Sequence, residues 1–201
     1  MSTAAILAGG RARRLGGLNK SHLVIDGRTI LDRQLDVLRR VADRIVIVVT
    51  EQAAFADSGV PVVPDVNPGA GALGGIQTAL AVADGPVLVV ACDMPFLTEA
   101  FLAHVIKAAH GADAAVPRDE GGYHPLCACY TPACASAIRT RVEAGALKVT
   151  DLFNDVHVRT IDRDEIAAFD PDGFLLFNIN TPEDLARAAR GRGPAGVMTP
   201  S

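Results

Sequence analysis

The sequence contains no tryptophan, and aromatic residues make up only 4% of it. A folded core must therefore be built mainly from Val, Ile, Leu and Ala. No stretch approaches the roughly 18 consecutive apolar residues of a membrane-spanning helix. The N-terminus has neither the basic start nor the long apolar run of a secretory signal. We therefore expect a cytoplasmic protein that does not associate with membranes.

Cysteine is also scarce, with four residues in the chain. None is spaced as C-x-x-C, and all lie in apolar segments, at Cys92, Cys127, Cys129 and Cys134. Disulfide bonds or a zinc site would be the more specific interpretation. Reduced and buried thiols are favoured instead, because cysteines in such segments usually serve as small apolar residues.

An excess of positive charge is missing as well. The chain has 19 basic and 23 acidic residues and a formal net charge of −4, whereas nucleic-acid-binding domains are usually basic. This excludes a general polyanion binder and makes any positively charged site a local one. One such region lies near the N-terminus, where residues 4–27 read AAILAGGRARRLGGLNKSHLVIDG.

Short β-branched runs alternate with longer amphipathic ones in the first half of the chain. They predict strands at Thr3–Leu7, Arg44–Val49, Val60–Val63 and Pro86–Cys92. They predict helices at Thr29–Val41, Gly74–Ala83 and Thr98–Ala109. This strand–helix–strand repetition indicates a parallel sheet with right-handed crossovers.

The rhythm changes after Gly111. Residues 112–117 and 124–130 are strand-like, with a turn at 118–122 between them, which indicates antiparallel pairing. The next predicted elements are a helix from Pro132 to about Glu143 and strands at 156–161 and 174–180. The chain then forms a final helix, with Thr181 as its N-cap and Pro182 as its first residue.

The expected fold class is therefore α/β. It is a three-layer α/β/α arrangement with a mostly parallel twisted sheet, a Rossmann-like N-terminal half and a partly antiparallel C-terminal part. A chain of 201 residues suits one domain. We expect it to span residues 1–190, with 191–201 as a flexible tail.

The glycine-rich stretch follows the first predicted strand, where ligands bind in open α/β sheets. Glycines let the backbone approach a ligand and aim N–H groups at an anion, so a phosphate, most simply a polyphosphate, fits this loop. A solvated basic loop is the alternative. A P-loop is excluded because Asn19 precedes Lys20 where that motif needs glycine. A dinucleotide fingerprint does occur at Gly69, Gly71 and Gly74, but its first glycine follows Asn67-Pro68 in a loop, so it is weak.

The segment LAGGRARRLGGLNK resembles the signature L-A-G-G-x-[SA]-x-R-[ML]-G-x(2,3)-K of nucleotidyltransferases with a glycosyltransferase-A-like fold. Within that superfamily the chain is most similar to the molybdenum cofactor guanylyltransferase (MobA) family. Further blocks match in order: VPDVNPGAGALGGIQTAL, VVACDMPFL, YHPLCACY and FNINTPEDL. Together the blocks span residues 4–188, approximately.

This resemblance implies a role for each matching residue. The backbone cradle of the nucleotide would be formed by Leu7, Ala8, Gly9 and Gly10. Lys20 would stabilise charge on the α-phosphate and the leaving pyrophosphate, with Arg14 as a second candidate, while Arg11 and Arg13 are more simply solvated. Asp65 corresponds to a position that contacts the nucleotide. Asp93 would bind Mg²⁺, which prefers carboxylate, phosphate and water oxygens; capping of the next helix is the structural alternative.

The acceptor pocket is less well defined. The resemblance places Asn178 and Asn180 near the active site, although Asn180 would serve equally as a helix cap. His124 with Pro125 would shape the acceptor pocket or simply end a strand. A general base is not required, because an attacking phosphate is already ionised at neutral pH.

The resemblance thus implies a nucleotidyltransferase that moves GMP from GTP to molybdenum-molybdopterin with Mg²⁺ and releases pyrophosphate. The product would pass to a molybdenum insertase or a molybdoenzyme chaperone. One departure affects base choice: the family often has Asn at the end of the second parallel strand, where this chain has Val48, with Thr50 two residues on. Molybdopterin cytidylyltransferase using CTP, a sugar-phosphate-activating enzyme and a non-catalytic nucleotide-binding protein of the same fold therefore remain alternatives.

Overall fold

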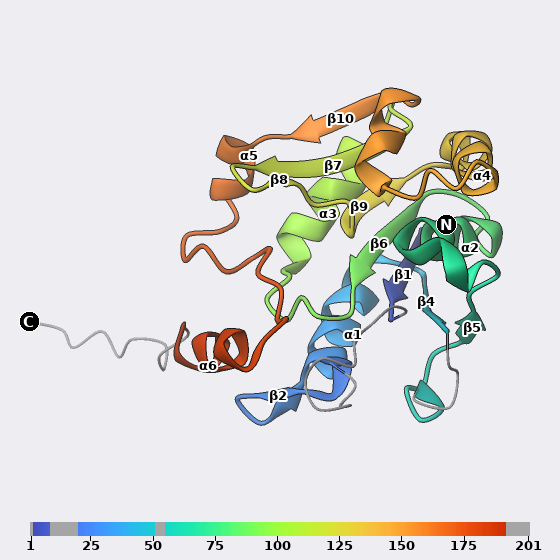
Figure 1. Ribbon diagram of the computed structural model, residues 1–201. Coiled ribbons are helices and arrows are strands. Elements are labelled where there is room, and N and C mark those ends of the chain that lie inside the picture. The colour runs from blue at the N-terminus through green and yellow to red at the C-terminus, as the bar shows by residue number, and fades with distance from the viewer. Residues whose placement is uncertain (1, 9–19, 51–54, 192–201) are drawn as a thin grey trace, which may run out of the picture.

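The computed structural model describes residues 2–8, 20–50 and 55–191. Its main sheet has the strand order β10-β7-β9-β6-β1-β4-β5, and the short β8 pairs with β7 (Figure 1). The strands are β1 (Thr3–Leu7), β4 (Arg44–Val49), β5 (Val62–Pro64), β6 (Val87–Ala91), β7 (Ala114–Asp119), β8 (Gly122–Tyr123), β9 (Cys127–Tyr130) and β10 (Val158–Ile161). Strands β1, β4, β5 and β6 are parallel, and β9 runs antiparallel to both β6 and β7. The predicted mostly parallel sheet with an antiparallel part is confirmed.

Helices cover both faces of this sheet. One face packs against α1 (Ile30–Val41), α3 (Glu99–Ala108) and α5 (Arg163–Ala167). The other packs against α2 (Gly71–Ala81) and α4 (Ala135–Glu143), with short 3-10 helices at Pro132–Cys134 and Val149–Asn154. The final helix, α6 (Pro182–Gly191), lies beside the short strand β2 (Val24–Ile25) (Figure 1). The three-layer prediction is confirmed.

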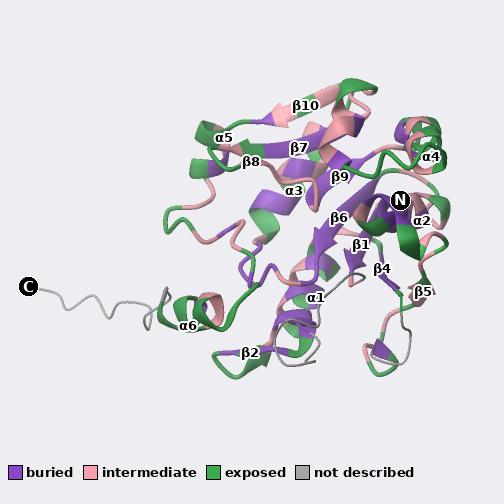
Figure 2. Cartoon of the chain, viewed as in Figure 1, coloured by how far each residue is buried: buried purple, intermediate pink, exposed green. Residues whose placement is uncertain are grey.

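Strand β1 shows why the central strands lack polar alternation. Ala4 and Ile6 face the α1/α3 side, whereas Ala5 and Leu7 face the α2/α4 side. All four are buried, and the neighbouring β6 is buried along its whole length (Figure 2). A strand covered on both faces needs apolar residues at every position, and a fully buried Ile contributes about 1.5–3 kcal/mol.

Two helices begin at the threonines that mark their predicted starts. The Asp32 amide donates to Thr29 Oγ1 at 3.0 Å at the start of α1, and the Phe101 amide donates to Thr98 Oγ1 at 3.4 Å at the start of α3. Such caps satisfy N–H groups that have no partner within the helix. Helix α1 then turns one face, which includes Gln34 and Leu38, into the core.

A hairpin that the sequence analysis did not anticipate precedes α1. Its strands are β2 (Val24–Ile25) and β3 (Arg28–Thr29), joined by Asp26 at φ 49° and Gly27 at φ 77°. Positive φ at both central residues is the geometry of a type I′ turn, for which Asp-Gly is a favoured pair. The signal was therefore present in the sequence.

The strand predicted at residues 174–180 is wrong. This segment pairs with no strand among the described residues, and its backbone groups find other partners. The amides of Phe174 and Leu175 both donate to Asp170 Oδ1, and the Ile179 amide donates to the carbonyl of Asp93. Apolar residues here pack separately into two parts of the core, as the burial of Leu175 and Ile179 shows, so an apolar run did not require a strand.

Candidate active site

The carboxyl ends of the parallel strands bring Leu7 and Asp93 to one edge of the sheet. Leu7 at the end of β1 pairs in register with Val48 of β4 and with Ala91 of β6. Asp93 therefore follows the end of β6 close to the end of β1. Because β9 runs the other way, its start meets the same edge, and the Ala91 amide donates to the Leu126 carbonyl at 2.8 Å.

Three polar side chains meet at this edge from distant parts of the chain. Lys20 Nζ lies 3.1 Å from Asp93 Oδ2 and donates a 2.6 Å hydrogen bond to Asn180 Oδ1. Lys20 comes from a 3-10 helix at Lys20–His22, Asp93 follows β6, and Asn180 precedes α6. We call these three residues the Lys20 cluster.

Burial gives the Lys20 cluster its electrostatic importance. The side chains of Lys20 and Asp93 are only 10% and 16% exposed. Removing such charges from water costs several kcal/mol per ion, roughly, unless a partner of opposite charge is close. The pair therefore places two weakly screened charges at the sheet edge. Lys20 could bind a phosphate there and Asp93 a cation, in exchange for their contact with each other.

Asp93 retains an unused acceptor. Its Oδ1 atom is buried and has no hydrogen-bond partner, although buried acceptors are normally satisfied. A carboxylate oxygen of this kind fits a hard divalent cation. Within the described part of the chain, no three His, Cys, Asp or Glu side chains form a metal cluster, so phosphate oxygens and water would supply the other ligands.

The helix-capping alternatives are resolved by the contacts. At α3 the cap is Thr98, and at α6 the Asp184 amide donates to Thr181 Oγ1 at 3.1 Å. The Asn180 side chain contacts Lys20, and only its backbone amide contributes to the α6 start, by donating to Asp184 Oδ2 at 2.9 Å. This hydrogen bond is the main cause that holds the pKa of Asp184 below its ordinary value.

Asp65 follows the end of β5 and organises the entry to α2. Its Oδ1 accepts hydrogen bonds of 2.9 Å from both the Asn67 amide and the Thr78 hydroxyl. This arrangement brings the chain close to α2, so that a Cβ at Gly74 would lie 2.4 Å from the Asn67 carbonyl oxygen. One Asp65 oxygen is therefore committed to local structure.

His124 is held by a carboxylate that sequence reasoning did not single out. His124 Nε2 lies 2.8 Å from Asp119 Oδ2, and the two side chains are 22% and 37% exposed. Burial acts to raise the pKa of Asp119, but the hydrogen bond and charge of His124 outweigh it, so the pKa is lowered. Only the fold reveals this pair, since the turn through Gly121 and Gly122 brings the residues together.

The remaining predicted residues differ in what the structure describes. Gly9, Gly10, Arg11, Arg13 and Arg14 lie outside the described residues. The Ala8 amide already donates to the Val48 carbonyl at 2.9 Å, and the Leu7 carbonyl accepts from Cys92 at 3.2 Å. These two hydrogen bonds therefore tie the end of β1 to the ends of β4 and β6. Asn178 is exposed.

Val48 stands at the end of β4, where the family often has Asn. The Val48 side chain is 2% exposed and packs into the core beneath α2. Its side chain is therefore not available to contact a base. Thr50, just beyond the strand, is exposed.

The four cysteines are buried and free of disulfide bonds. Burial raises the pKa of the thiols to about 12 in each case. Thiols held in this way are poor nucleophiles and metal ligands. The prediction of reduced structural thiols is confirmed.

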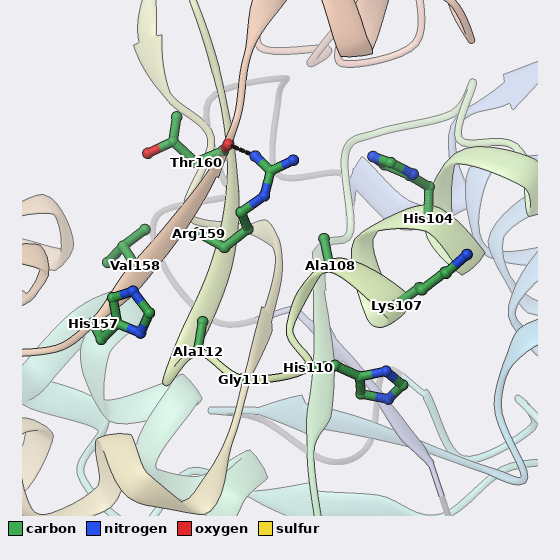
Figure 3. A pocket seen from close by; sticks show the side chains of 10 residues that line it. All are labelled: His104, Lys107, Ala108, His110, Gly111, Ala112, His157, Val158, Arg159 and Thr160. Atoms are coloured by element: carbon green, nitrogen blue, oxygen red, sulfur yellow. Dashed lines mark hydrogen bonds between the residues drawn. The ribbon is translucent and has the colours of Figure 1, made fainter.

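A separate hollow of about 600 Å³ lies at the opposite edge, between the end of α3 and the start of β10 (Figure 3). Its floor includes Gly111 and Ala112, and His110 and His157 stand on either side of them. None of the predicted site residues lines it. The hollow is therefore distinct from the carboxyl-edge site.

A buried lysine–carboxylate pair lies at the carboxyl edge of a mostly parallel sheet that is covered on both faces, which is where open α/β proteins bind their ligands. The chain is a nucleotidyltransferase. It belongs to the family described as MobA-like NTP transferase domain, whose model matches residues 4–158. Membership of this family implies the use of a divalent metal ion.

Similar proteins cover nearly the whole chain. A molybdenum cofactor guanylyltransferase of Desulfosudis oleivorans is 36% identical over 188 residues, 92% of this chain and 93% of that protein. A probable molybdenum cofactor guanylyltransferase of Pelotomaculum thermopropionicum is also 36% identical over 188 residues, 93% and 91% of the two chains. The crystal structure of molybdopterin-guanine dinucleotide biosynthesis protein A from Archaeoglobus fulgidus superposes with a TM-score of 0.82 at 29% identity, covering 94% of this chain and 97% of that one.

Within the described residues, no helix is long and apolar enough to cross a membrane.

Proposed function

We propose that this protein transfers GMP from GTP to molybdenum-molybdopterin, with Mg²⁺ as its metal ion. A terminal phosphate oxygen of the pterin attacks the α-phosphorus of GTP, the bond to the β-phosphate oxygen breaks, and pyrophosphate leaves. The observation that carries the proposal is the buried Lys20 cluster at the carboxyl edge of the sheet. The similarity to molybdenum cofactor guanylyltransferases over more than 90% of the chain supports the choice of substrates.

The chain's own residues act mainly by binding and by electrostatic stabilisation. Lys20 neutralises negative charge that builds on the α-phosphate and the leaving pyrophosphate, in a site where little water screens it. The Asn180 side chain fixes the direction of the Lys20 ammonium through their 2.6 Å hydrogen bond. No residue needs to remove a proton, because the attacking phosphate is ionised.

Asp93 is the residue that would hold Mg²⁺, through the carboxylate that carries the unpartnered Oδ1. An ion held there would supply positive charge at the reacting phosphates. Asp93 also holds the Lys20 side chain in place before substrates arrive, because the two groups are 3.1 Å apart.

The other site residues are assigned from the resemblance to the family. We assign nucleotide binding to Leu7, Ala8, Gly9, Gly10 and Asp65, and we assign Arg14 to the pyrophosphate. We assign the acceptor pocket to His124, Asn178 and Asn180. The Asp119–His124 contact of 2.8 Å supports a fixed imidazole there.

The choice between guanine and cytosine depends on the residues at the end of β4. Because Val48 is buried in the core, guanine would be read by the exposed Thr50 or by backbone groups. This same observation keeps the CTP-dependent reaction as a second candidate. A transient handover to a molybdenum insertase or a molybdoenzyme chaperone in the cytoplasm would follow from the chemistry of a labile product.

The test is pyrophosphate release with molybdenum-loaded molybdopterin and Mg²⁺, with GTP and CTP compared in parallel. Release with GTP and little with CTP is the expected result. A preference for CTP would replace guanylyl by cytidylyl transfer. Absence of release with either nucleotide would favour a non-catalytic nucleotide-binding protein.

Two variants test the residue roles in the same assay. Asp93→Asn should abolish Mg²⁺-dependent turnover while the fold is retained, and full turnover would refute the metal assignment. Lys20→Ala should lose far more rate than Arg11→Ala. Equal losses would contradict the distinction between these two basic residues.

A further inference from the structure

Gln34 is a buried polar side chain on α1 that contacts the turn containing Asp93. It is only 2% exposed. Its amide Nε2 donates to the Ala91 carbonyl at 2.7 Å and to the Met94 carbonyl at 3.0 Å. These two carbonyls stand on either side of the Cys92-Asp93 dipeptide, so one side chain holds both ends of the short turn that carries the metal-binding carboxylate.

The orientation of the Gln34 amide is dictated by these contacts. A rotation that exchanged its oxygen and nitrogen would aim the oxygen at two carbonyl oxygens, which are acceptors only. In the observed orientation, Oε1 is buried and has no hydrogen-bond partner. An unsatisfied buried acceptor costs about 1–3 kcal/mol. The fold tolerates this cost at Gln34 because the same amide donates to the carbonyls of Ala91 and Met94, which an apolar residue of similar size would leave without this donor.

The same turn is fixed at two further points. The Cys92 amide donates to the Leu7 carbonyl at 3.2 Å, which ties the turn to the end of β1. The Asp93 carbonyl accepts from the Ile179 amide at 3.0 Å, next to Asn180. The turn thus joins β1, α1 and the segment before α6, and the contribution of α1 is the Gln34 amide.

We propose that Gln34 is a positioning residue for Asp93. By fixing the carbonyls of Ala91 and Met94, it sets the direction of the Asp93 carboxylate toward Lys20 and toward a divalent cation. This inference rests on the proposed function, since it concerns the metal-dependent step. Replacing a residue that orients a metal ligand without touching the metal typically lowers metal affinity or activity by about 10–100-fold.

Gln34→Met is the test variant, because methionine is of similar length and has no hydrogen-bond donor. Leu35→Ala is the control, because Leu35 is a neighbouring buried residue of α1 that packs in the core. Gln34→Asn is a milder variant, to be used if Gln34→Met does not fold. It keeps the amide but is one methylene shorter, so it cannot reach both carbonyls.

The first measurement is amide hydrogen exchange in residues 91–97, compared with the second half of α1. Gln34→Met should speed exchange in the turn selectively, whereas Leu35→Ala should affect α1 at least as much as the turn. The second measurement is the Mg²⁺ concentration that half-saturates turnover. It should rise at least tenfold in Gln34→Met and stay within twofold of the wild type in Leu35→Ala.

The proposal is overturned if Gln34→Met leaves turn exchange and the Mg²⁺ requirement unchanged. It is also overturned if Gln34→Met and Leu35→Ala change both quantities in the same proportion, since Gln34 would then contribute only to general stability. Failure of the proposed function would be seen separately, as absence of turnover in the wild-type protein. In that case hydrogen exchange still decides whether Gln34 fixes the turn.

Discussion

Replacing Asp93 by Asn would leave Lys20 charged, buried and without its counter-ion. Loss of one partner of a buried pair costs about 3–5 kcal/mol when burial is complete. Here the side chains retain 10% and 16% exposure, and Lys20 keeps its hydrogen bond to Asn180. We therefore expect a smaller loss of unfolding free energy, about 1–3 kcal/mol.

The prediction can be measured by thermal and denaturant unfolding of a double-mutant cycle. For a chain of this size, 2 kcal/mol corresponds to a fall in Tm of roughly 4–8 °C. Lys20→Met should destabilise by a similar amount, because it leaves Asp93 buried and uncompensated. The double variant should be more stable than the sum of the two losses predicts, with a coupling free energy of about 1–3 kcal/mol.

An exposed ion pair provides the control for this cycle. Arg40 and Glu99 lie 3.5 Å apart, with side chains 68% and 54% exposed. Glu99→Gln should change the unfolding free energy by less than about 0.5 kcal/mol. If Asp93→Asn behaved like this control and the Lys20–Asp93 cycle were additive, the reasoning from burial would be refuted.

Three further predictions concern packing, acid stability and thiol reactivity. Gly74→Ala should lower the unfolding free energy by about 1–3 kcal/mol, because the new Cβ would lie 2.4 Å from the Asn67 carbonyl oxygen. Gly69→Ala is the control in the same denaturation experiment, because a Cβ there would meet nothing within 4 Å. Equal effects of the two substitutions would contradict the packing argument. The lowered pKa of Asp184 means that its contribution to stability is present above its unfolded-state pKa and is lost as pH falls through the lower folded-state pKa. Asp184→Asn should thus destabilise at pH 7 and converge with the wild type in strong acid, whereas a pH-independent difference in Tm would contradict this linkage. The four cysteines, whose pKa values burial raises to about 12, should resist a thiol reagent at pH 8 and react after denaturation; rapid labelling of the folded protein would show that they are accessible.

Much of the fold could be predicted because the local signals agreed with the tertiary structure. Thr29 and Thr98 marked the starts of α1 and α3, and the bounds of β1 and β4 matched the apolar runs without change. The error at residues 174–180 arose where tertiary contacts decided the conformation. Apolar residues there are divided between two parts of the core without regular alternation, and the Asp170 carboxylate satisfies amides that a strand would have paired.

The candidate site was predictable only where a residue type is tied to a motif. Lys20, Asp93 and Asn180 each lie in a block that resembles the family, although their mutual contacts could not be read from the sequence. Gln34 lies in no such block. Its role depends on which carbonyls α1 meets across the sheet edge, and one amide on an amphipathic helix carries no signal of that.

The contact between Lys20 and Asn180 spans 160 positions of the chain. A ribosome that builds this protein therefore releases Lys20 and Asp93 long before the residue that completes their arrangement. Closing so long a loop is also entropically costly and is favoured only once the segment before α6 has docked. The Lys20 cluster is thus among the last features to be assembled, and a chain cut short before residue 180 would carry the sheet yet lack the third member of this cluster.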